Sequence, residues 1–481
     1  MNFKDKKITV MGLGLLGRGV GVVKYLVSKG AKVTITDLKT DKELKSSIEE
    51  IKKFYKNIKY QISNIKITNK KSRINKKYRI LNTRYKIHPI KFILGGHRLS
   101  DFKNVDMVFK AAGVPLDSPY IAESRRHNVP VVMDDALFAR EASCKIIGVT
   151  GTRGKTTTST LIYELAKATG KKAYLAGNIK GVATLPLLDK VKKDDLMVLE
   201  LSSWQLQGWH DLKISPHIAL VTNIYRDHMN YYKNSMAKYV EDKKAILKYQ
   251  AKNDFLVLNR NCSWCKKFVK EAKGKVIWFS KNDVAAKWRL KILGEHNLEN
   301  IAAAMAVGKI LGLSPSQIKK AAENFRGISG RMEFAGEADR VKYYNDTTAT
   351  MPEATVAALS ALAETKKQKN EKTKKQIVLI AGGADKNLKF NDLAKAIKKY
   401  TKAVVLLNGT ATPKIQHQLR VTRYGLPVTL ANSMPEAVRT ASKFAARDDI
   451  VLLSPACASF GMFKNEFDRG EQFTKEFSNI K

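Results

Sequence analysis

Residues 145–169 have the sequence KIIGVTGTRGKTTTSTLIYELAKAT, in which an apolar run, a glycine-containing loop and a helical pattern follow one another. The order predicts a strand over Lys145–Thr150, a loop, and a helix over TSTLIYELAKAT. Backbone N–H groups in such a loop form a nest that binds phosphate at the N-terminus of the following helix. The chain is therefore predicted to be an α/β protein that binds ATP.

The side chains of this loop suit a triphosphate. Lys155 can neutralise the β- and γ-phosphates, and the Thr156 hydroxyl can coordinate magnesium. The loop is shorter than the common GxxxxGK[ST] pattern, and a plain glycine turn is the alternative interpretation. The predicted ATP-binding residues of the loop are Gly151, Thr152, Arg153, Gly154, Lys155, Thr156 and Thr157.

A second glycine motif lies near the N-terminus, between strands expected at Ile8–Met11 and Lys32–Asp37. It matches the dinucleotide-binding fingerprint, in which an acid at the end of the second strand accepts hydrogen bonds from ribose. A nicotinamide dehydrogenase is one interpretation, and a UDP-sugar enzyme is another because a UDP-sugar has the same diphosphate and ribose. The residues predicted to bind such a ligand are Gly12, Gly14, Leu15, Gly17 and Asp37.

Strand and helix patterns recur along the chain, and 481 residues suffice for three domains. We expect three α/β domains in series, over residues 1–131, 132–327 and 328–481. Strands of the last domain are expected at Ile377–Ala381, Ala403–Asn408 and Ile450–Ser454.

The composition narrows the class of protein. No run approaches the ~20 consecutive apolar residues of a membrane span, and the N-terminal sequence lacks the pattern of a signal peptide. Four cysteines do not make a disulfide scaffold in so long a chain, so we expect a cytoplasmic protein. The pair Cys262 and Cys265 has no second CxxC at zinc spacing, which favours buried free thiols.

The net charge of +43 raises the alternative of nucleic-acid binding. A segment at about residues 54–92 is rich in Lys, Arg, Asn and Ile and contains no Asp or Glu. It is predicted to be a solvated insertion in a surface loop, with a basic arm as the alternative. The segment shows no regular aromatic pattern for base stacking, and lysines are scattered along the chain. We therefore do not expect a nucleic-acid partner.

Further motifs, in chain order, resemble those of the Mur ligase family. TGTRGKTT at residues 150–157 resembles the family's ATP loop, TGTxGKT. The other matching segments are Glu200–Leu206 (ELSSFQL in the family), Asn223–Met229 (NxxxDHM), Gly294–Asn297 with Asn300 (GxHNxxN), Arg331–Glu333 (RxE), Asn345–Thr350 (NDSKAT), Gly382–Gly383 with Asp385–Lys386, and Ser454–Ser459 (SPACAS).

The resemblance implies an ATP-dependent ligase of peptidoglycan precursor synthesis that works through an acyl phosphate. The sequence LLSPACAS, followed by FKN and RG, is typical of the branch that adds D-glutamate to UDP-N-acetylmuramoyl-L-alanine. The implied fold has a Rossmann-like UDP-substrate domain, a central P-loop ATPase domain and a C-terminal Rossmann-like amino-acid domain. A sister Mur-type or folylpolyglutamate-type ligase is the alternative. We expect a monomer with small-molecule substrates.

The resemblance also assigns residues. It implies two Mg²⁺ ions and catalysis by Lys155, Glu200, His228 and a carbamylated Lys243, for which Lys244 is the nearest rival. The implied metal-site residues are Thr156, Glu200, His228 and Lys243. The residues implied to bind the nucleotide are Asn297, Asn300, Arg331 and Asp346. Those implied to bind the amino acid are Lys386, Ser459 and Thr350. Those implied to bind the UDP substrate are Asn178 and His228.

Three positions depart from the family pattern. Thr348 stands where NDSKAT has its lysine, and Leu16 stands where the family has a threonine near uracil. Glu466 follows the KN pair, where the family commonly has phenylalanine, and Phe467 comes one position later. We expect these changes to affect contacts to the substrates rather than the reaction.

Overall fold

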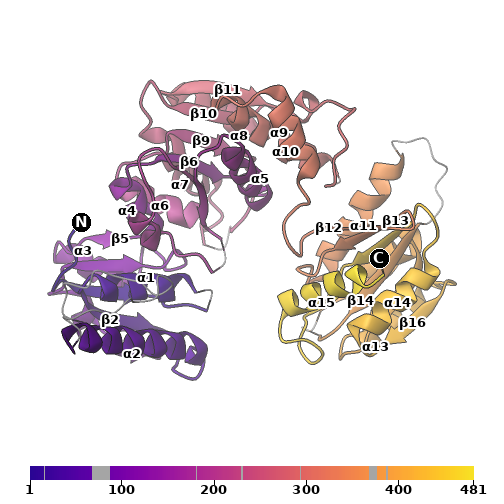
Figure 1. Ribbon diagram of the computed structural model, residues 1–481, viewed down its shortest axis with the longest axis horizontal. Coiled ribbons are helices and arrows are strands. Elements are labelled where there is room, and N and C mark those ends of the chain that lie inside the picture. Colours follow the sequence, from indigo (N-terminus) through magenta and orange to yellow (C-terminus); the bar gives the residue numbers. More distant parts are fainter. Residues whose placement is uncertain are drawn as a thin grey trace. The chain divides into compact units, whose positions relative to one another are not determined.

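A computed structural model describes residues 1–15, 17–67, 87–179, 181–228, 231–292, 294–367, 376–385 and 388–480. They form three sheets within two compact units (Figure 1). The first unit is Met1–Ser280 with Ala303–Leu313, and the second is Lys281–Ala302 with Ser314–Lys481. The predicted α/β class with parallel sheets is confirmed, whereas the division into three domains stays a prediction.

The first sheet belongs to the first unit and has the strand order β3-β2-β1-β4-β5, with all neighbours parallel. The order changes direction between β1 and β4, so the glycine loop after β1 lies at a topological switch point, where α/β sheets bind ligands. The strands are β1 (Lys7–Met11), β2 (Lys32–Asp37), β3 (Lys91–Leu94), β4 (Met107–Lys110) and β5 (Val131–Val132). The helices around this sheet are α1 (Arg18–Ser28), α2 (Lys45–Ile67), η2 (Leu99–Phe102) and α3 (Pro119–Arg126).

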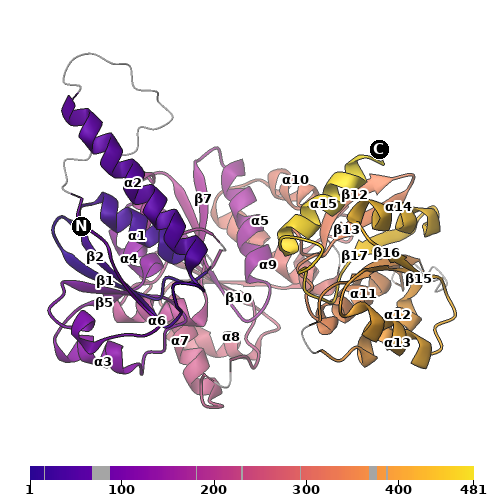
Figure 2. The same cartoon turned by 90° about the horizontal axis from the view of Figure 1, so that it is seen from below.

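The surface-loop prediction for residues 54–92 is wrong at both ends of the segment. Residues up to Ile67 continue α2, which Figure 2 shows as one long helix, and β3 begins at Lys91. The helix packs on the core through Ile48, Ile51, Phe54 and Tyr55, and Ile58, at the same helical spacing, is also buried. Intervening lysines and asparagines obscured this period in the sequence. Residues 68–86 lie outside the described residues.

The second sheet, also in the first unit, has the order β11-β10-β9-β6-β8-β7 and is fully parallel. Its strands are β6 (Lys145–Thr150), β7 (Ala173–Gly177), β8 (Leu196–Glu200), β9 (Ile218–Val221), β10 (Phe255–Asn259) and β11 (Lys275–Phe279). The helices of this region are α4 (Asp134–Glu141), α5 (Lys155–Ala168), η3 (Leu185–Asp189), α6 (Ser203–Asp211), α7 (Met236–Lys248), α8 (Ser263–Phe268) and η4 (Val269–Glu271). The next elements along the chain are η5 (Lys281–Asp283) and α10 (Pro315–Asn324), which belong to the second unit, and α9 (Glu295–Ile310), which has residues in both units.

One hydrophobic core joins the two sheets of the first unit. It contains buried residues of β1 and α1, such as Val10 and Leu26, together with Leu199 of β8 and Leu206 of α6. Burial of apolar surface on this scale is the main term that holds such a unit together. The two ligand loops of this unit, after β1 and after β6, are therefore carried by one packed body.

The third sheet lies in the second unit and has the order β12-β13-β17-β14-β15-β16. Only the β12–β13 pair is antiparallel among these strands. The strands are β12 (Glu333–Ala338), β13 (Val341–Asn345), β14 (Ile377–Gly382), β15 (Thr401–Leu407), β16 (Val428–Ala431) and β17 (Ile450–Leu453). The helices are α11 (Pro352–Lys367), α12 (Asn391–Tyr400), α13 (Thr412–Val421), α14 (Met434–Phe444) and α15 (Glu466–Ser478).

The strands expected from apolar runs are confirmed, with ends that shift by one or two residues. The four strands that differ are β1, β14, β15 and β17, whereas β2 and β6 have the expected ends. No helix in the described part of the chain combines the length and the apolar character that a membrane crossing requires.

A buried carboxyl group in the first unit makes stability depend on pH. Asp135 is fully buried, and its Oδ2 accepts a hydrogen bond from Trp209 Nε1 at 2.8 Å. Burial, and then the neighbouring Asp134 charge, raise the pKa of Asp135 to about 7. The folded state thus keeps a proton that the unfolded state releases at lower pH. The stabilisation that Asp135 contributes is fully present below its pKa in the unfolded chain, and it is lost as pH rises through its folded pKa of about 7.

We expect Asp135→Asn, which cannot ionise, to gain stability over the wild type as pH rises. Between about pH 5 and about pH 8 the gain should be on the order of 2 kcal/mol. Thermal or urea unfolding of both proteins across this range measures it. Asp392→Asn is the control, because the Asp392 side chain is 86% exposed and its replacement should show no such trend. A constant difference between Asp135→Asn and the wild type at all pH values would contradict the assignment.

Candidate functional site

The loop between β6 and α5 is fixed from behind by the segment that follows β9. The Asn223 side chain accepts from the Arg153 N–H at 2.9 Å and donates to the Arg153 carbonyl at 3.1 Å, and the Asn223 carbonyl accepts from the Thr152 N–H at 2.8 Å. Thr222 Oγ1 donates to the same Arg153 carbonyl at 2.7 Å. Gly151 has φ +145°, and a Cβ there would lie 1.9 Å from Thr222 Oγ1, so only glycine fits.

Two lysines converge on this loop. Lys155 Nζ donates to the carbonyls of Gly151 and Thr152 at 3.1 and 3.0 Å. Lys243 comes from α7, is 2% exposed, and donates from Nζ to the same Gly151 carbonyl at 3.0 Å. Burial first, and then the charge of Lys155, lower the pKa of Lys243 well below its usual range. The structure therefore brings Lys243, rather than Lys244, to the ATP loop.

Glu200 ends β8 beside this loop, since β8 pairs with β6 with Glu200 opposite Val149. Its side chain is 2% exposed; Oε1 accepts from Asn178 Nδ2 at 2.9 Å, and Oε2 is buried without a hydrogen-bond partner. Gly177 has φ +87°, and a Cβ there would lie 2.2 Å from the Glu200 carbonyl oxygen. A buried carboxylate oxygen with an open coordination position, beside a phosphate loop, fits a hard cation such as Mg²⁺. Asn178, expected to touch the UDP substrate, holds this carboxylate.

His228 lies on the surface in the same unit. Its φ is +54°, and its ring stacks on Trp204 with centroids 4.6 Å apart. Trp204 opens α6, directly after Glu200–Ser203, so α6 and the end of β8 position the imidazole. Asp227 Oδ2 lies 3.7 Å from His228 Nε2. The exposed ring is held by stacking and is accessible to a ligand.

The N-terminal glycine loop is tied to Asp37. Asp37 is buried, and its carboxylate accepts the backbone N–H groups of Gly14 at 3.1 Å and Lys39 at 2.9 Å. Leu15 is exposed, and Gly17 precedes α1 with a left-handed φ of +80°. Gly12 lies against Ala111, where a Cβ would come within 2.8 Å. Asp37 thus holds the glycine loop with Oδ2 and the backbone after β2 with Oδ1, while Leu16 lies outside the described residues.

The remaining predicted nucleotide residues belong to the second unit. Asn297 and Asn300 are both buried on α9, and Asn300 Nδ2 donates to Asn297 Oδ1 at 3.0 Å. Arg331 is exposed in the loop before β12. Asp346 is buried; its oxygens accept from the Met332 N–H at 3.1 Å and from Ser454 Oγ at 2.8 Å. Desolvation raises the pKa of Asp346 to about 7.

Three loops meet at the carboxyl ends of the neighbouring strands β13, β17 and β14. The Ala456 N–H donates to the Ala349 carbonyl at 2.9 Å, and the Gly382 N–H donates to the Pro455 carbonyl at 2.8 Å. Ala384 and Ala458 also pair through a β-bridge. Thr350 and buried Ser459, both predicted to bind the amino acid, lie on these joined loops. Lys386, the third such residue, lies outside the described residues.

Arg469 is a positioning residue that the sequence analysis did not single out. It is fully buried on α15, and its Nε and Nη2 donate to Thr347 Oγ1 and the Thr347 carbonyl at 3.0 and 2.8 Å. Nη1 donates to the Cys457 carbonyl at 3.2 Å. Burial lowers the pKa of Arg469 to about 10, which leaves the guanidinium charged at neutral pH. One side chain thus joins the loops that carry Thr350 and Ser459.

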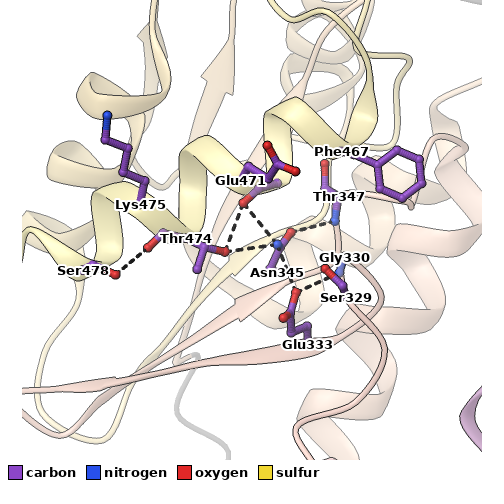
Figure 3. A pocket seen from close by; sticks show the side chains of 11 residues that line it. Ser329, Gly330, Glu333, Asn345, Thr347, Phe467, Glu471, Thr474, Lys475 and Ser478 are labelled. Carbon is purple, nitrogen blue, oxygen red and sulfur yellow. Dashed lines mark hydrogen bonds between the residues drawn. The ribbon is translucent and has the colours of Figure 1, made fainter. Parts of the chain in front are cut away.

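Beside these loops is a pocket of about 290 Å³ between α15 and the loop before β12 (Figure 3). Glu333 Oε2 accepts from the Gly330 N–H at 2.8 Å and from Asn345 Nδ2 at 3.4 Å, and Asn345 Nδ2 also donates to the Gly470 carbonyl at 3.2 Å. Phe467, one position after the family's phenylalanine, lines this pocket. The glutamate of the RxE segment therefore lines this pocket and joins the Gly330 backbone to the Asn345 side chain.

Two family profiles match the chain. They are the Mur ligase middle domain over residues 149–308 and the Mur ligase, glutamate ligase domain, over residues 330–457. Proteins named UDP-N-acetylmuramoylalanine–D-glutamate ligase are similar over nearly the whole chain. That of Roseiflexus sp. (strain RS-1) is 35% identical, with 99% of each chain covered, and that of Acetivibrio thermocellus is 34% identical, with 99% of this chain and 97% of the relative covered.

Solved structures show the same fold at lower identity. The UDP-N-acetylmuramate–alanine ligase of Thermotoga maritima has a TM-score of 0.55 at 17% identity, covering 99% of this chain and 100% of the other. A UDP-N-acetylmuramoyl-L-alanyl-D-glutamate–2,6-diaminopimelate ligase has a TM-score of 0.53 at 18% identity, covering 75% of this chain and 89% of the other. At such identities the likeness concerns the fold alone.

We expect Arg469→Met to destabilise the second unit by on the order of 3 kcal/mol, because three buried acceptors lose their donor. Urea unfolding with a probe in that unit measures the loss. Arg340→Met is the matched control, because Arg340 makes an exposed ion pair with Asp448 and its loss should cost under about 1 kcal/mol. Equal effects of the two substitutions would contradict the role given to Arg469.

Proposed function

The chain belongs to the Mur ligase family, and we propose from this membership that it joins D-glutamate to UDP-N-acetylmuramoyl-L-alanine in peptidoglycan precursor synthesis. ATP supplies the free energy: the substrate carboxylate attacks the γ-phosphate, which gives an acyl phosphate and ADP. The amino group of D-glutamate then attacks the acyl carbon, the amide forms, and phosphate leaves. Phosphorylation is needed because oxide is a poor leaving group from a carboxylate.

The observation that carries the proposal is the convergence of Lys155, Glu200 and Lys243 on one phosphate loop. Lys155 follows the loop and lies over its carbonyls, so a small side-chain movement brings the ammonium to a bound phosphate. Glu200 supplies a buried oxygen for a cation, and Asn178 orients that carboxylate. This set of groups serves phosphoryl transfer through charge stabilisation and positioning.

Thr156, Glu200, His228 and Lys243 are the residues we propose for two Mg²⁺ ions, with Lys243 carbamylated. Bound Mg²⁺ would neutralise charge on the transferring phosphoryl group. Lys243 in its amine form shares the Gly151 carbonyl with the Lys155 ammonium, and burial favours the uncharged amine. An uncharged amine can add carbon dioxide to give a carbamate. The carbamate is an anion, so the repulsion from Lys155 becomes an attraction.

We propose that the three sheets mark three domains. Residues 1–131 would bind the UDP substrate through Gly12, Gly14, Leu15, Gly17 and Asp37, with contacts from Asn178 and His228. Residues 132–327 would bind ATP, together with Arg331 and Asp346. Residues 328–481 would bind the amino acid through Thr350, Lys386 and Ser459.

We propose a cytoplasmic monomer. All four cysteines are buried free thiols, as in proteins of a reducing compartment. A nicotinamide dehydrogenase is disfavoured, because the chain has a second phosphate loop, after β6, with Lys155 over its carbonyls.

The function is tested by phosphate release from ATP and Mg²⁺ with UDP-N-acetylmuramoyl-L-alanine. We expect release with D-glutamate and none with L-glutamate or other amino acids in parallel reactions. Release only with another amino acid would assign the chain to a sister ligase and direct attention to Thr348 and Glu466. No release with any amino acid would refute the proposal.

The role of Lys243 is tested by Lys243→Ala, which we expect to lose at least about 10²-fold in kcat. Acetate or formate should restore part of the activity, because a small carboxylate can occupy the space of the carbamate. Lys244→Ala is the matched control. Lys244 pairs with Glu271 and Glu241 on the helix surface, so this variant should keep wild-type activity. Absence of rescue, or equal loss in both variants, would contradict carbamylation of Lys243.

A further inference from the structure

The pair Cys262 and Cys265 lies where the chain leaves β10 and enters α8. Cys262 precedes the helix, and its sulfur accepts the backbone N–H of Cys265 at 3.3 Å. Cys262 is 8% exposed and Cys265 is fully buried. A reagent from solution therefore reaches Cys262 first, and Cys265 lies directly behind it.

Several donors converge on the Cys262 sulfur. They are the thiol of Cys265 and the backbone N–H groups of Cys265, Ile224 and Trp264. Donors arranged around a sulfur stabilise the thiolate, which is the nucleophilic form. The hydrogen bond from Cys265 is the largest of the causes that lower the pKa of Cys262 to about 6. The same hydrogen bond raises the pKa of Cys265, which keeps its proton.

These contacts connect the thiols to the ATP loop. Ile224 directly follows Thr222 and Asn223, which hold the backbone of Arg153. The Cys262 N–H donates to the Asn259 carbonyl at 3.2 Å, and Asn259 Nδ2 donates to the Thr222 carbonyl at 2.9 Å. A change at Cys262 therefore acts on the segment that braces the phosphate loop.

A metal site does not account for the pair. Among the described residues, no group of three or more His, Cys, Asp or Glu side chains could hold a metal ion. Zinc needs three or four such ligands. A CxxC pair at the start of a helix, with one stabilised thiolate and one protonated thiol, instead has the parts of a dithiol–disulfide couple.

We propose that Cys262 and Cys265 form a reversible disulfide and that its formation weakens nucleotide binding at the loop braced by Thr222 and Asn223. The oxidant is a low-molecular-weight disulfide, RSSR. The Cys262 thiolate attacks one sulfur of RSSR, which gives a mixed disulfide and releases RS⁻. Cys265 then loses its proton and attacks the Cys262 sulfur, which releases the second RS⁻. Two protein thiols are oxidised and RSSR is reduced to two RSH.

The disulfide should weaken nucleotide binding for a geometric reason. The new S–S bond replaces the Cys265-to-Cys262 hydrogen bond and draws the two sulfurs together, so the Asn259–Cys262 turn must shift. The bonds from this turn to Thr222 and Ile224 then weaken, and the phosphate loop loses its support. The effect on ATP rests on the proposed function, whereas disulfide formation does not.

The experiment equilibrates the full-length protein in oxidised and reduced glutathione, quenches it with acid and counts free thiols after denaturation. We expect the count to fall from four to two in the wild type and to return to four with reductant. The dissociation constant of ATP with Mg²⁺, measured on both forms by calorimetry, should rise on the order of tenfold on oxidation, since small displacements of positioning groups have effects of this size. Phosphate release with D-glutamate is measured on the reduced protein as well. Release there supports the proposed function independently, so a failure of the redox proposal can be told apart from a failure of the function.

Cys262→Ser/Cys265→Ser is the matched variant, because serine is also a preferred N-cap and should keep α8 intact. Its ATP affinity should not respond to the redox buffer. Cys144 and Cys457 remain in this variant and report oxidation at other sites. Four free thiols in the oxidised wild type would overturn the disulfide. A disulfide that leaves the ATP affinity unchanged, or an equal response of the double variant, would overturn its coupling to the loop.

Discussion

The bracing of the phosphate loop by Thr222 and Asn223 is the constraint on which the first unit depends. A loop that offers some of its N–H groups to phosphate must be held in place through its other backbone groups. The Asn223 side chain resolves this by bonding both backbone groups of Arg153, while Thr222 bonds the same carbonyl from β9. Gly151 must lack a Cβ because the brace approaches so closely. The fixed loop then sets where Glu200 and Lys243 stand.

Two basic side chains and one buried carboxylate meet at this loop. Lys155 and Lys243 donate to one carbonyl oxygen, an arrangement that is unfavourable if both are ammonium ions in a buried place. Glu200 keeps one buried oxygen without a protein partner. Bound phosphate, a divalent cation and the proposed carbamate would together supply the charges that balance these groups. Binding affinity and protein stability are therefore linked here, since a ligand that binds only the folded state stabilises it.

In the second unit, buried polar side chains hold the loops at the ends of the strands, as Thr222 and Asn223 hold the phosphate loop in the first unit. Asp346 joins the loop before β12 to the end of β17, and Arg469 joins the loops after β13 and β17. Each of these charged groups is desolvated, and each is satisfied by hydrogen bonds to backbone or hydroxyl groups. Such networks favour one arrangement of the loops, because any other would leave a buried charge without partners. Thr350 and Ser459 lie on these loops, so the favoured loop arrangement sets their positions.

How far the sequence predicts these features depends on the kind of contact. Buried parallel strands are continuous apolar runs, so β6 and β2 were predicted to the residue. The helical part of residues 54–67 was missed because polar residues interrupt its apolar stripe. Hydrogen bonds such as Asn223 to Arg153 join residues far apart in the chain, and no local pattern indicates them.

Two buried cations did leave a trace that an explicit helical projection would detect. In α7 the buried residues Tyr239, Val240, Ile246 and Leu247 form one stripe, and Lys243 lies within it, whereas Lys244 lies off it. In α15 Arg469 shares a stripe with Phe473 and Phe477 in the same way. A cation on the apolar face of a helix must be desolvated on folding, so it needs a compensating partner. Both side chains have such a partner, since Lys243 donates to the Gly151 carbonyl and Arg469 joins the loops after β13 and β17.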